Sequence, residues 1–382
     1  MASLDLRKAF DRIEYHALFD ALREQGVGDN YLALLASMYS DQTGCIRGSK
    51  KYFNIERGVK QGDIISPVLF NAALELVMRR WKIRINGSGI NLGIGECLTN
   101  IRYADDLMLY ASSLEDLTFM MQILFEELQK VGLQINGSKC KIASTDPDNV
   151  LQFIDVNGDC IEIMNESETH KYLGRMFNGD PVSRSTDVYA HRCQCAWMKF
   201  HQNHDALTDK NISIKLMLIF FQSVISAIIL SGLGQIPMPR FLLNKLDALQ
   251  RRMIRRIVGW HRVDDEPWKD TMSRMKNRVS TALSYFPIES WSAQLSRRQF
   301  KLAIKLANSP NNWAYKFIKW HPPDTVMHAC RSRGRPKCRW DDYLINFNVY
   351  YDGHNDWLHS IQSDVMFASY EETFVQFMSS LN

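Results

Sequence analysis

Two adjacent aspartates, Asp105 and Asp106, lie in the apolar segment IRYADDLMLYA, residues 101–111. Burying an ionised carboxylate among apolar side chains costs several kcal/mol unless a positive charge meets it. The apolar residues on either side predict two strands, and a tight turn between them would bring both carboxylates to one edge of a sheet. A third carboxylate, Asp5, lies at the end of the strand-like segment SLDL near the start of the chain.

Three carboxylates at one sheet edge repel one another unless divalent cations lie among them. Oxygen ligands without His or Cys nearby suit Mg²⁺ or Mn²⁺. Two such ions about 4 Å apart activate an attacking oxygen and stabilise a leaving one in phosphoryl transfer. The spacing alone leaves a plainer alternative open, in which Asp105–Asp106 is an exposed turn and Asp5 is an ordinary strand-end residue.

The neighbouring segments predict the elements that would position these carboxylates. Apolar residues at helical spacing predict helices over residues 10–25, 67–81 and 114–131, and Ser113 with Asp116 resembles a capping box at the start of the third. Asn157-Gly158 predicts the turn of a β-hairpin. Residues 1–180 are therefore expected to form an α+β domain with helices on one face of an antiparallel sheet.

The charges are unevenly distributed along the chain. Residues 241–340 contain 21 Lys and Arg against 7 Asp and Glu, whereas residues 341–382 contain 7 Asp and Glu and no Lys or Arg. The basic block would attract a polyanion, although solvated basic helix faces explain it equally well. In LDALQRRMIRRIVGW, residues 246–260, the apolar residues share one helix face and four arginines occupy the rest, which suits a phosphate backbone. These are Arg251, Arg252, Arg255 and Arg256.

Other features bear on location and on metal binding. The 8 scattered cysteines and the charged start MASLDLRKAFD predict an intracellular protein, nuclear or cytoplasmic and not secreted. The uncharged stretch 216–239 is interrupted by Gln, Ser, Gly and Pro, so a buried core helix is expected there and no membrane partner. Cys330, Cys338, His354 and His359 are poorly spaced for zinc, because the first two cysteines lie too far apart.

Taken in order, five segments resemble the motifs of reverse transcriptases. They are LDLRKAFD (4–11), similar to the first catalytic motif, RGVKQGDIISPVLFNAAL (57–74), YADD (103–106), GLQINGSKCK (132–141), and HKYLG (170–174), similar to the primer-grip hairpin. The KAFD and QGDIISPVLFN sequences resemble the non-LTR (LINE-type) retrotransposon branch. Residues 246–260 and RGRPKCRWDDYL, 333–344, also resemble the tail of LINE-type polymerases.

This resemblance implies RNA-directed DNA synthesis, in which two Mg²⁺ (or Mn²⁺) ions support nucleotidyl transfer to a primer 3′-hydroxyl. The implied partners are an RNA template, a DNA primer and deoxynucleoside triphosphates. Asp5 and Asp105 would ligate both ions, with Asp106 at the same site. Lys139 would approach the triphosphate, although as an isolated surface lysine it would be unremarkable.

Further residues match positions around the nucleotide and the primer. Phe10 would lie under the incoming sugar and exclude a 2′-hydroxyl, or it is simply the first core residue of its helix. Gln61 and Gly62 would pack beside the nucleotide, the alternative being an ordinary helix-entry loop. The resemblance assigns the primer end to four residues, for which hydrophobic packing is an equal alternative: Tyr103, Tyr172, Leu173 and Gly174.

The resemblance divides the chain into a palm (1–180), a helical thumb (181–265) and a basic C-terminal region with an acidic tail (266–382). Family members carry finger motifs before the first catalytic aspartate, and only four residues precede Asp5 here. We therefore expect an N-terminally truncated fragment with its fingers largely missing and with weak or absent polymerase activity. The alternative is a catalytically dead retrotransposon remnant that only binds nucleic acid through residues 240–340.

Overall fold

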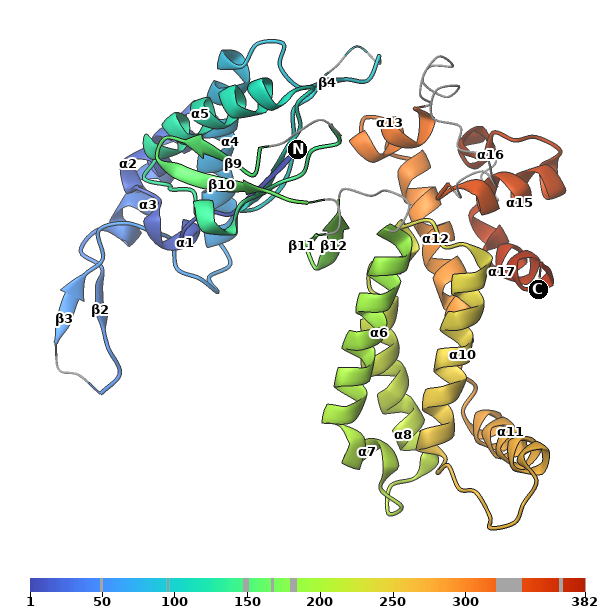
Figure 1. Ribbon diagram of the computed structural model, residues 1–382. Helices are drawn as coiled ribbons and strands as arrows, with labels where there is room; N and C mark the ends of the chain where they lie inside the picture. Colours follow the sequence, from blue (N-terminus) through green and yellow to red (C-terminus); the bar gives the residue numbers. More distant parts are fainter. Residues whose placement is uncertain are drawn as a thin grey trace. The chain divides into compact units, whose positions relative to one another are not determined.

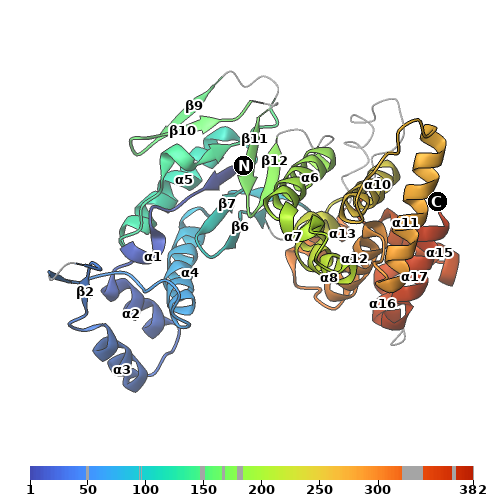
Figure 2. The same ribbon diagram turned by 90° about the horizontal axis from the view of Figure 1, so that it is seen from below.

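The computed structural model describes residues 1–48, 51–93, 95, 97–146, 151–165, 168–178, 184–320, 339–363 and 367–381. The chain forms two compact units, Met1–Asp180 and Pro181–Asn382. The first unit is mixed α and β, and within the described residues the second contains helices only (Figures 1 and 2). The chain is thus a mixed α+β protein.

The first unit is built around a six-stranded sheet with the strand order β6-β7-β1-β8-β10-β9. All neighbours are antiparallel except β8 and β10, which run parallel, so the expectation of a purely antiparallel sheet was wrong. The reason is topological: after β8 the chain forms the β9–β10 hairpin, and its second strand, not its first, pairs with β8. The strands are β1 (Ala2–Leu4), β6 (Asn100–Tyr103), β7 (Asp106–Leu109), β8 (Lys141–Ile142), β9 (Phe153–Val156) and β10 (Asp159–Ile163).

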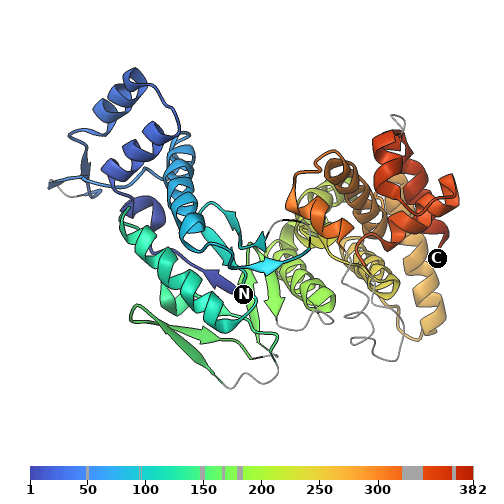
Figure 3. The same cartoon turned by 90° about the horizontal axis from the view of Figure 1, so that it is seen from above.

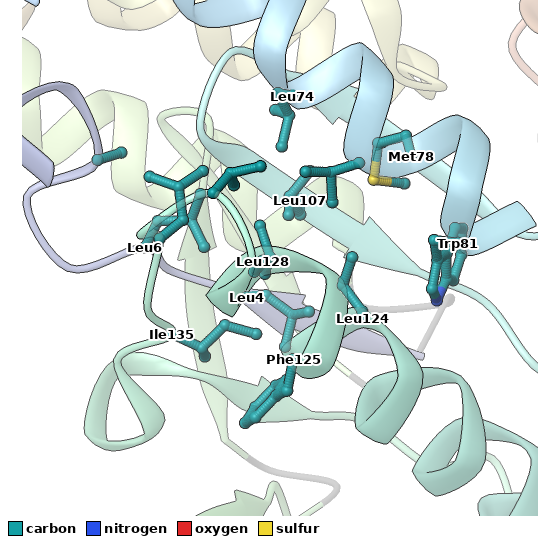
Figure 4. Packing of buried hydrophobic residues seen from close by; sticks show 14 of the residues in the cluster. Leu4, Leu6, Leu74, Met78, Trp81, Leu107, Leu124, Phe125, Leu128 and Ile135 are labelled. Carbon is teal, nitrogen blue, oxygen red and sulfur yellow. The ribbon is translucent and has the colours of Figure 1, made fainter. Parts of the chain in front are cut away.

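Two long helices, α4 and α5, pack against the sheet and supply a large part of the core. Figure 4 shows Leu74 and Met78 of α4 near Leu107 of β7, with Trp81 farther along α4, and Leu124 and Leu128 of α5 lie beside Leu4 of β1. Ser113 caps α5 by accepting a hydrogen bond from the Asp116 backbone at 3.1 Å, as predicted. The helices of this unit are α1 (Ala9–Arg12), α2 (Tyr15–Glu24), α3 (Asp29–Tyr39), α4 (Ser66–Arg84), α5 (Leu114–Gln129) and the 3₁₀ turn η1 (Gly137–Lys139).

Three small hairpins complete the first unit, and a fourth forms one edge of the sheet. The predicted turn at Asn157-Gly158 is confirmed, since both residues adopt positive φ (53° and 85°) between the paired strands β9 and β10. His170 Nε2 of β11 lies 3.2 Å from Ser3 Oγ of β1, and this contact places β11 against the sheet at β1. The small hairpins are β2 (Thr43–Cys45) with β3 (Tyr52–Asn54), β4 (Ile90–Asn91) with β5 (Cys97–Leu98), and β11 (Thr169–Tyr172) with β12 (Arg175–Asn178).

In the second unit, α12 contacts α10, α16 and α17 (Figure 3). Phe300 of α12 is fully buried, and its ring stacks on that of Phe374 in α17 with centroids 5.3 Å apart. The helices are α6 (Arg184–Gln202), α7 (His204–Thr208), α8 (Ile214–Phe220), the π-helix η2 (Phe221–Ser226), α9 (Ala227–Leu230), η3 (Leu233–Gln235), α10 (Arg240–Ile257), α11 (Trp268–Tyr285), α12 (Trp291–Ala307), α13 (Trp313–Lys319), α15 (Asp342–Asp352), α16 (Trp357–Ser363), η4 (Phe367–Tyr370) and α17 (Glu371–Ser380).

Helix α10 and helix α12 lie on opposite sides of the domain boundary expected at residue 265, and they pack together. The buried Gln250 side chain of α10 donates to the Glu289 carbonyl at 3.0 Å and accepts from the Trp291 amide at 3.0 Å. Because an unpaired buried amide is costly, these bonds hold the two helices together. The predicted division into thumb and C-terminal region therefore separates segments of one compact unit.

One helical stretch, Ile214–Gln235, has the length and apolar composition of a membrane span. It runs through α8, η2, α9 and η3, and 44% of its most apolar 18 residues are buried. Core helices of soluble proteins pass the same test, so this is a weak indication of a membrane span, and the buried helix stays a prediction. Of the residues considered for zinc, Cys330 and Cys338 lie outside the described residues, and His354 and His359 are exposed.

Candidate active site

The YADD segment forms the hairpin turn between β6 and β7. Tyr103 and Asp106 are the last paired residues, which leaves Ala104 and Asp105 as the connection. Ala104 adopts φ 52°, a left-handed conformation that is uncommon for a residue other than glycine. Such strain persists only where the surrounding structure holds it, and it concentrates at functional sites. The turn therefore places Asp105 at its tip and Asp106 at the start of β7.

The register of the sheet brings Asp5 to the same place. β1 runs antiparallel to β7 with Leu4 opposite Leu107, so Asp5 continues the strand toward Asp106. The pKa of Asp106 is raised, first because its carboxyl is partly buried and then because the negative charges of Asp105 and Asp5 oppose its ionisation. Asp5, although distant in sequence, is thus an electrostatic neighbour of the adjacent pair Asp105 and Asp106 at one end of the sheet.

These carboxylates match a divalent cation in their chemistry. Asp5, Asp105 and Asp106 offer only oxygen ligands, which Mg²⁺ and Mn²⁺ prefer, and a cation would relieve the repulsion that raises the pKa of Asp106. Over the ranges that the structure describes, however, no three Asp, Glu, His or Cys side chains converge closely enough to hold a metal ion. The donor types fit the ion, and metal ligation by these three residues stays a prediction.

Residues of the segment 135–140 contact both the backbone and the side chain of Asp5. The backbone amide of Asn136 donates to the backbone carbonyl of Asp5 at 2.8 Å, and its side-chain nitrogen Nδ2 donates to Asp5 Oδ2 at 3.3 Å. Lys139 Nζ lies 3.7 Å from the same carboxylate oxygen, and 68% of its side chain is exposed. Asn136 was absent from the predicted site, although the GLQINGSKCK segment that drew attention to Lys139 contains it.

Cys140 is a second residue beside Asp5 that sequence reasoning missed. Its Sγ accepts a long hydrogen bond from the Asp5 amide at 3.4 Å. Burial raises the pKa of the Cys140 thiol to about 12, so it stays protonated near neutral pH. The thiol is therefore a packing group that supports the backbone of Asp5.

Of the predicted primer-end residues, Tyr172 reaches the aspartates. Its hydroxyl donates to the Asp106 carbonyl at 3.3 Å, and burial, followed by the negative charge of Asp106, raises its pKa to about 12. Leu173 and Gly174 form the turn between β11 and β12, both with positive φ (47° and 74°). Leu173 and Tyr103 are exposed, so hydrophobic packing does not explain their positions.

The RGVKQGD loop is tied to helix α1 through its backbone. The Val59 amide donates to the Phe10 carbonyl at 2.6 Å. Gly58 has φ 93°, and a Cβ there would lie 2.8 Å from the Asp11 carbonyl oxygen, so a side chain at this position would force the two segments apart. Because Gln61 and Gly62 follow Val59 in the chain, this backbone contact places them near Phe10.

Phe10 itself is half-buried and stacks on Phe70 of α4, with ring centroids 4.8 Å apart. This stacking contact supports the role of Phe10 as a core residue. Its role beneath a sugar stays a prediction. Gln61 and Gly62 are exposed, and Gly62 has φ 89°, where a Cβ would meet no atom within 4 Å. Their proposed place beside a nucleotide is sterically open.

In the second unit, the apolar face predicted for α10 is buried, whereas its arginines lie at or near the surface. Two of them contact an aromatic ring of α6. The guanidinium carbons of Arg252 and Arg256 lie 5.6 and 5.0 Å from the ring centroid of Trp197. Trp197 was not predicted, since no sequence signal distinguishes it from the apolar residues of α6.

Comparison with known proteins identifies the first unit. Residues 1–177 match the family model described as reverse transcriptase (RNA-dependent DNA polymerase). The Pol polyprotein of the type-2 retrotransposable element R2DM from Drosophila melanogaster is 33% identical over 144 residues, 37% of this chain and 13% of that protein. Residues 1–177 are thus similar to the reverse transcriptase family, and the similar curated protein belongs to a retrotransposable element.

Other similarities extend beyond the reverse transcriptase domain. A Pol polyprotein of an R2 element from Popillia japonica is 25% identical over 272 residues, 68% of this chain and 36% of that protein. A solved structure of telomerase from Candida albicans, in complex with a fragment of telomeric RNA, matches 83% of this chain and 48% of its own chain at 13% identity, with a TM-score of 0.35. The chain spans about an eighth to a third of the length of three related Pol polyproteins, from Drosophila melanogaster, Nasonia vitripennis and Popillia japonica.

Proposed function

We propose that this chain catalyses RNA-directed DNA synthesis with weak activity, by transfer of deoxynucleotides to a primer 3′-hydroxyl on an RNA template. The observation that carries the proposal is the placement of Asp5, Asp105 and Asp106 at one end of the sheet, where partial burial and then the charges of Asp105 and Asp5 raise the pKa of Asp106. Nucleotidyl transfer needs such a cluster of negative charge to hold cations at the reacting phosphate. The reverse transcriptase domain supplies the chemical class.

Each residue of the site has a part in this proposal. A pair of Mg²⁺ or Mn²⁺ ions, when bound, would supply charge stabilisation to the attacking and leaving oxygens. Asp5 and Asp105 would hold both ions, and Asp106 would complete the negative charge of the site. Asn136 fixes the Asp5 carboxylate, and the exposed Lys139 ammonium would donate a proton or a hydrogen bond to the leaving pyrophosphate.

The remaining assignments concern binding of the substrates. Phe10 would exclude a 2′-hydroxyl by its bulk, and Gln61 with Gly62 would line the nucleotide. Tyr172, fixed through its bond to Asp106, would position the primer end together with Gly174 and the exposed Tyr103 and Leu173. In this proposal the first unit acts as the palm and residues 181–265 act as the thumb. An intracellular, nuclear or cytoplasmic location remains a prediction.

Primer extension tests the proposal. The full chain is incubated with a DNA primer annealed to an RNA template, the four deoxynucleoside triphosphates, and either Mg²⁺ or EDTA. Binding of a labelled triphosphate is measured in parallel. We expect Mg²⁺-dependent extension, or at least Mg²⁺-dependent triphosphate binding, and the loss of both in Asp105→Asn. Nucleic-acid binding with neither activity would overturn the proposal in favour of a remnant that only binds nucleic acid.

A further inference from the structure

A connection joins α10 to α11 in the second unit (Figure 1). It contains the exposed Trp260, and the exposed Trp268 is the first residue of α11. Trp260 is 41% exposed and Trp268 is 58% exposed. Their ring centroids lie 6.0 Å apart, with the planes tilted by 57°. Large aromatic surfaces are costly to leave in water, and neighbouring exposed rings on a monomer mark interaction sites.

An arginine accompanies each of the two rings. The guanidinium carbon of Arg255 lies 6.0 Å from the Trp260 centroid, and that of Arg262 lies 6.0 Å from the Trp268 centroid. The surrounding sequence, residues 251–278, contains nine Lys and Arg against four Asp and Glu. The rings therefore lie in a region of positive charge, which favours a negatively charged partner with flat, stackable groups.

The connection is held in place by side chains of α11. Arg274 donates to the His261 carbonyl at 2.7 Å and to the Glu266 carboxylate at 2.8 Å, and Thr271 Oγ1 donates to the same carboxylate at 2.7 Å. Arg278 donates to the Val258 carbonyl at 2.7 Å. Hydrogen bonds from Arg274 and then Thr271 lower the pKa of Glu266 to about 2, so this brace persists down to strongly acidic pH. The rings are thus presented on a preorganised loop, which reduces the entropy lost on binding.

We propose that Trp260, Trp268, Arg255 and Arg262 form a binding site for single-stranded nucleic acid. Unpaired bases stack on the two indole rings, and the two guanidinium groups neutralise the adjoining phosphates. A duplex cannot use the site in this way, because its bases are already stacked on one another and present only their edges. The site is separate from the carboxylates of the first unit, and the proposal does not depend on polymerase activity.

Fluorescence anisotropy on the full chain tests the site. The probes are a labelled 12-nucleotide oligo(U), an oligo(dT) of the same length and a blunt hairpin duplex, all in EDTA without nucleotides. RNA and DNA single strands share the stacking and phosphate chemistry, and their relative affinities tell which strand the site prefers. Because neither metal nor nucleotide is present, a failure here leaves the polymerase proposal standing, and a failure of primer extension leaves this one standing.

We expect Trp260→Ala and Trp268→Ala each to raise the Kd for both single strands about tenfold, with the duplex Kd changed by less than about twofold. Trp268→Tyr should restore most of the affinity, since tyrosine also offers a stacking face. The matched control is Tyr285→Ala, which removes a 76% exposed aromatic side chain from the last residue of the same helix and should change no Kd. Unchanged single-strand affinity in both alanine variants, or an equal loss for single strand and duplex, would overturn the proposal.

Discussion

The acidic end of the sheet in the first unit and the basic helix α10 in the second hold their charges in opposite ways. At the sheet end, Asp5, Asp105 and Asp106 repel one another, and this repulsion contributes to the raised pKa of Asp106. On α10, Arg252 and Arg256 lie against the ring of Trp197, where the guanidinium groups are stabilised by a cation–π interaction. In the proposed function, the first region binds cations that neutralise it, whereas the second keeps its own cations ordered for contact with phosphates.

In the proposed function, this difference separates catalysis from nucleic-acid binding. Like charges are brought together only at a cost, which a chain tolerates where a ligand or a reaction requires it. Guanidinium groups that pack against an aromatic ring can neutralise a phosphate backbone, and this requires no chemical reaction. We therefore expect substitutions of the aspartates in the first region to abolish DNA synthesis and leave nucleic-acid binding intact. Substitutions of the arginines in the second region should weaken nucleic-acid binding and leave the catalytic chemistry intact.

The largest expected effect is at the turn between β6 and β7. Asp105→Asn keeps the shape of the side chain but removes one negative charge, so it should reduce primer extension roughly 10³-fold. The Kd for a primer–template duplex should change by less than about twofold, because Asp105 is not among the residues proposed to contact the phosphate backbone. Extension rates and anisotropy on the same preparation measure both quantities.

The control for that prediction is Asp29→Asn at the exposed start of α3, which should change neither quantity. A strong loss of duplex binding in Asp105→Asn would break the proposed separation between the two regions.

A smaller effect is expected on α10. Removing two cations in the double variant Arg252→Gln, Arg256→Gln should weaken nucleic-acid binding about tenfold and reduce the slope of log K against log salt by about 2. Anisotropy titrations at several salt concentrations measure both. Arg23→Gln with Lys82→Gln, two exposed cations of the first unit, is the matched control. An unchanged salt slope would show that the α10 arginines do not touch phosphate.

Trp197→Leu sharpens the comparison by keeping every charge and removing only the ring. Loss of the cation–π support should weaken binding by about two- to fivefold, because Arg252 and Arg256 become less ordered. The salt slope should stay the same, since the number of cations is unchanged. If Trp197→Leu lowered the slope as much as the double arginine variant does, the ring would have to be holding the arginines in contact with phosphate.

The smallest effect is expected at Ala104. Glycine adopts φ 52° without the steric cost that alanine bears, although it loses more chain entropy on folding. Ala104→Gly should therefore raise the free energy of unfolding by at most about 1 kcal/mol, measured by chemical denaturation. Ala36→Gly within α3 is the control of opposite sign and should lower it by about 1 kcal/mol. A destabilised Ala104→Gly would show that the alanine methyl group makes a favourable contact at the turn.

Much of the fold near the site could be predicted because its signals are local. The strands around Asp105, the cap at Ser113 and the Asn157-Gly158 turn each depend on a few consecutive residues, and the structure contains all three. The parallel pairing of β8 with β10 could not be predicted, because either strand of the following hairpin could have met β8. Cys140 was missed for a similar reason, since its contact with Asp5 spans 135 residues.

The sequence by itself determined which chemical groups are present, and it determined the turn that holds Asp105, since a two-residue connection between apolar strands can form from neighbouring residues alone. Only the tertiary structure decided which distant groups meet. Sheet register brings Asp5 to Asp106, a bridge between Leu6 and Ile135 brings Asn136 to Asp5, and helix packing brings Trp197 to the arginines of α10. Such meetings depend on how whole elements pack, and the packing energy is spread over many residues, so no short segment encodes it.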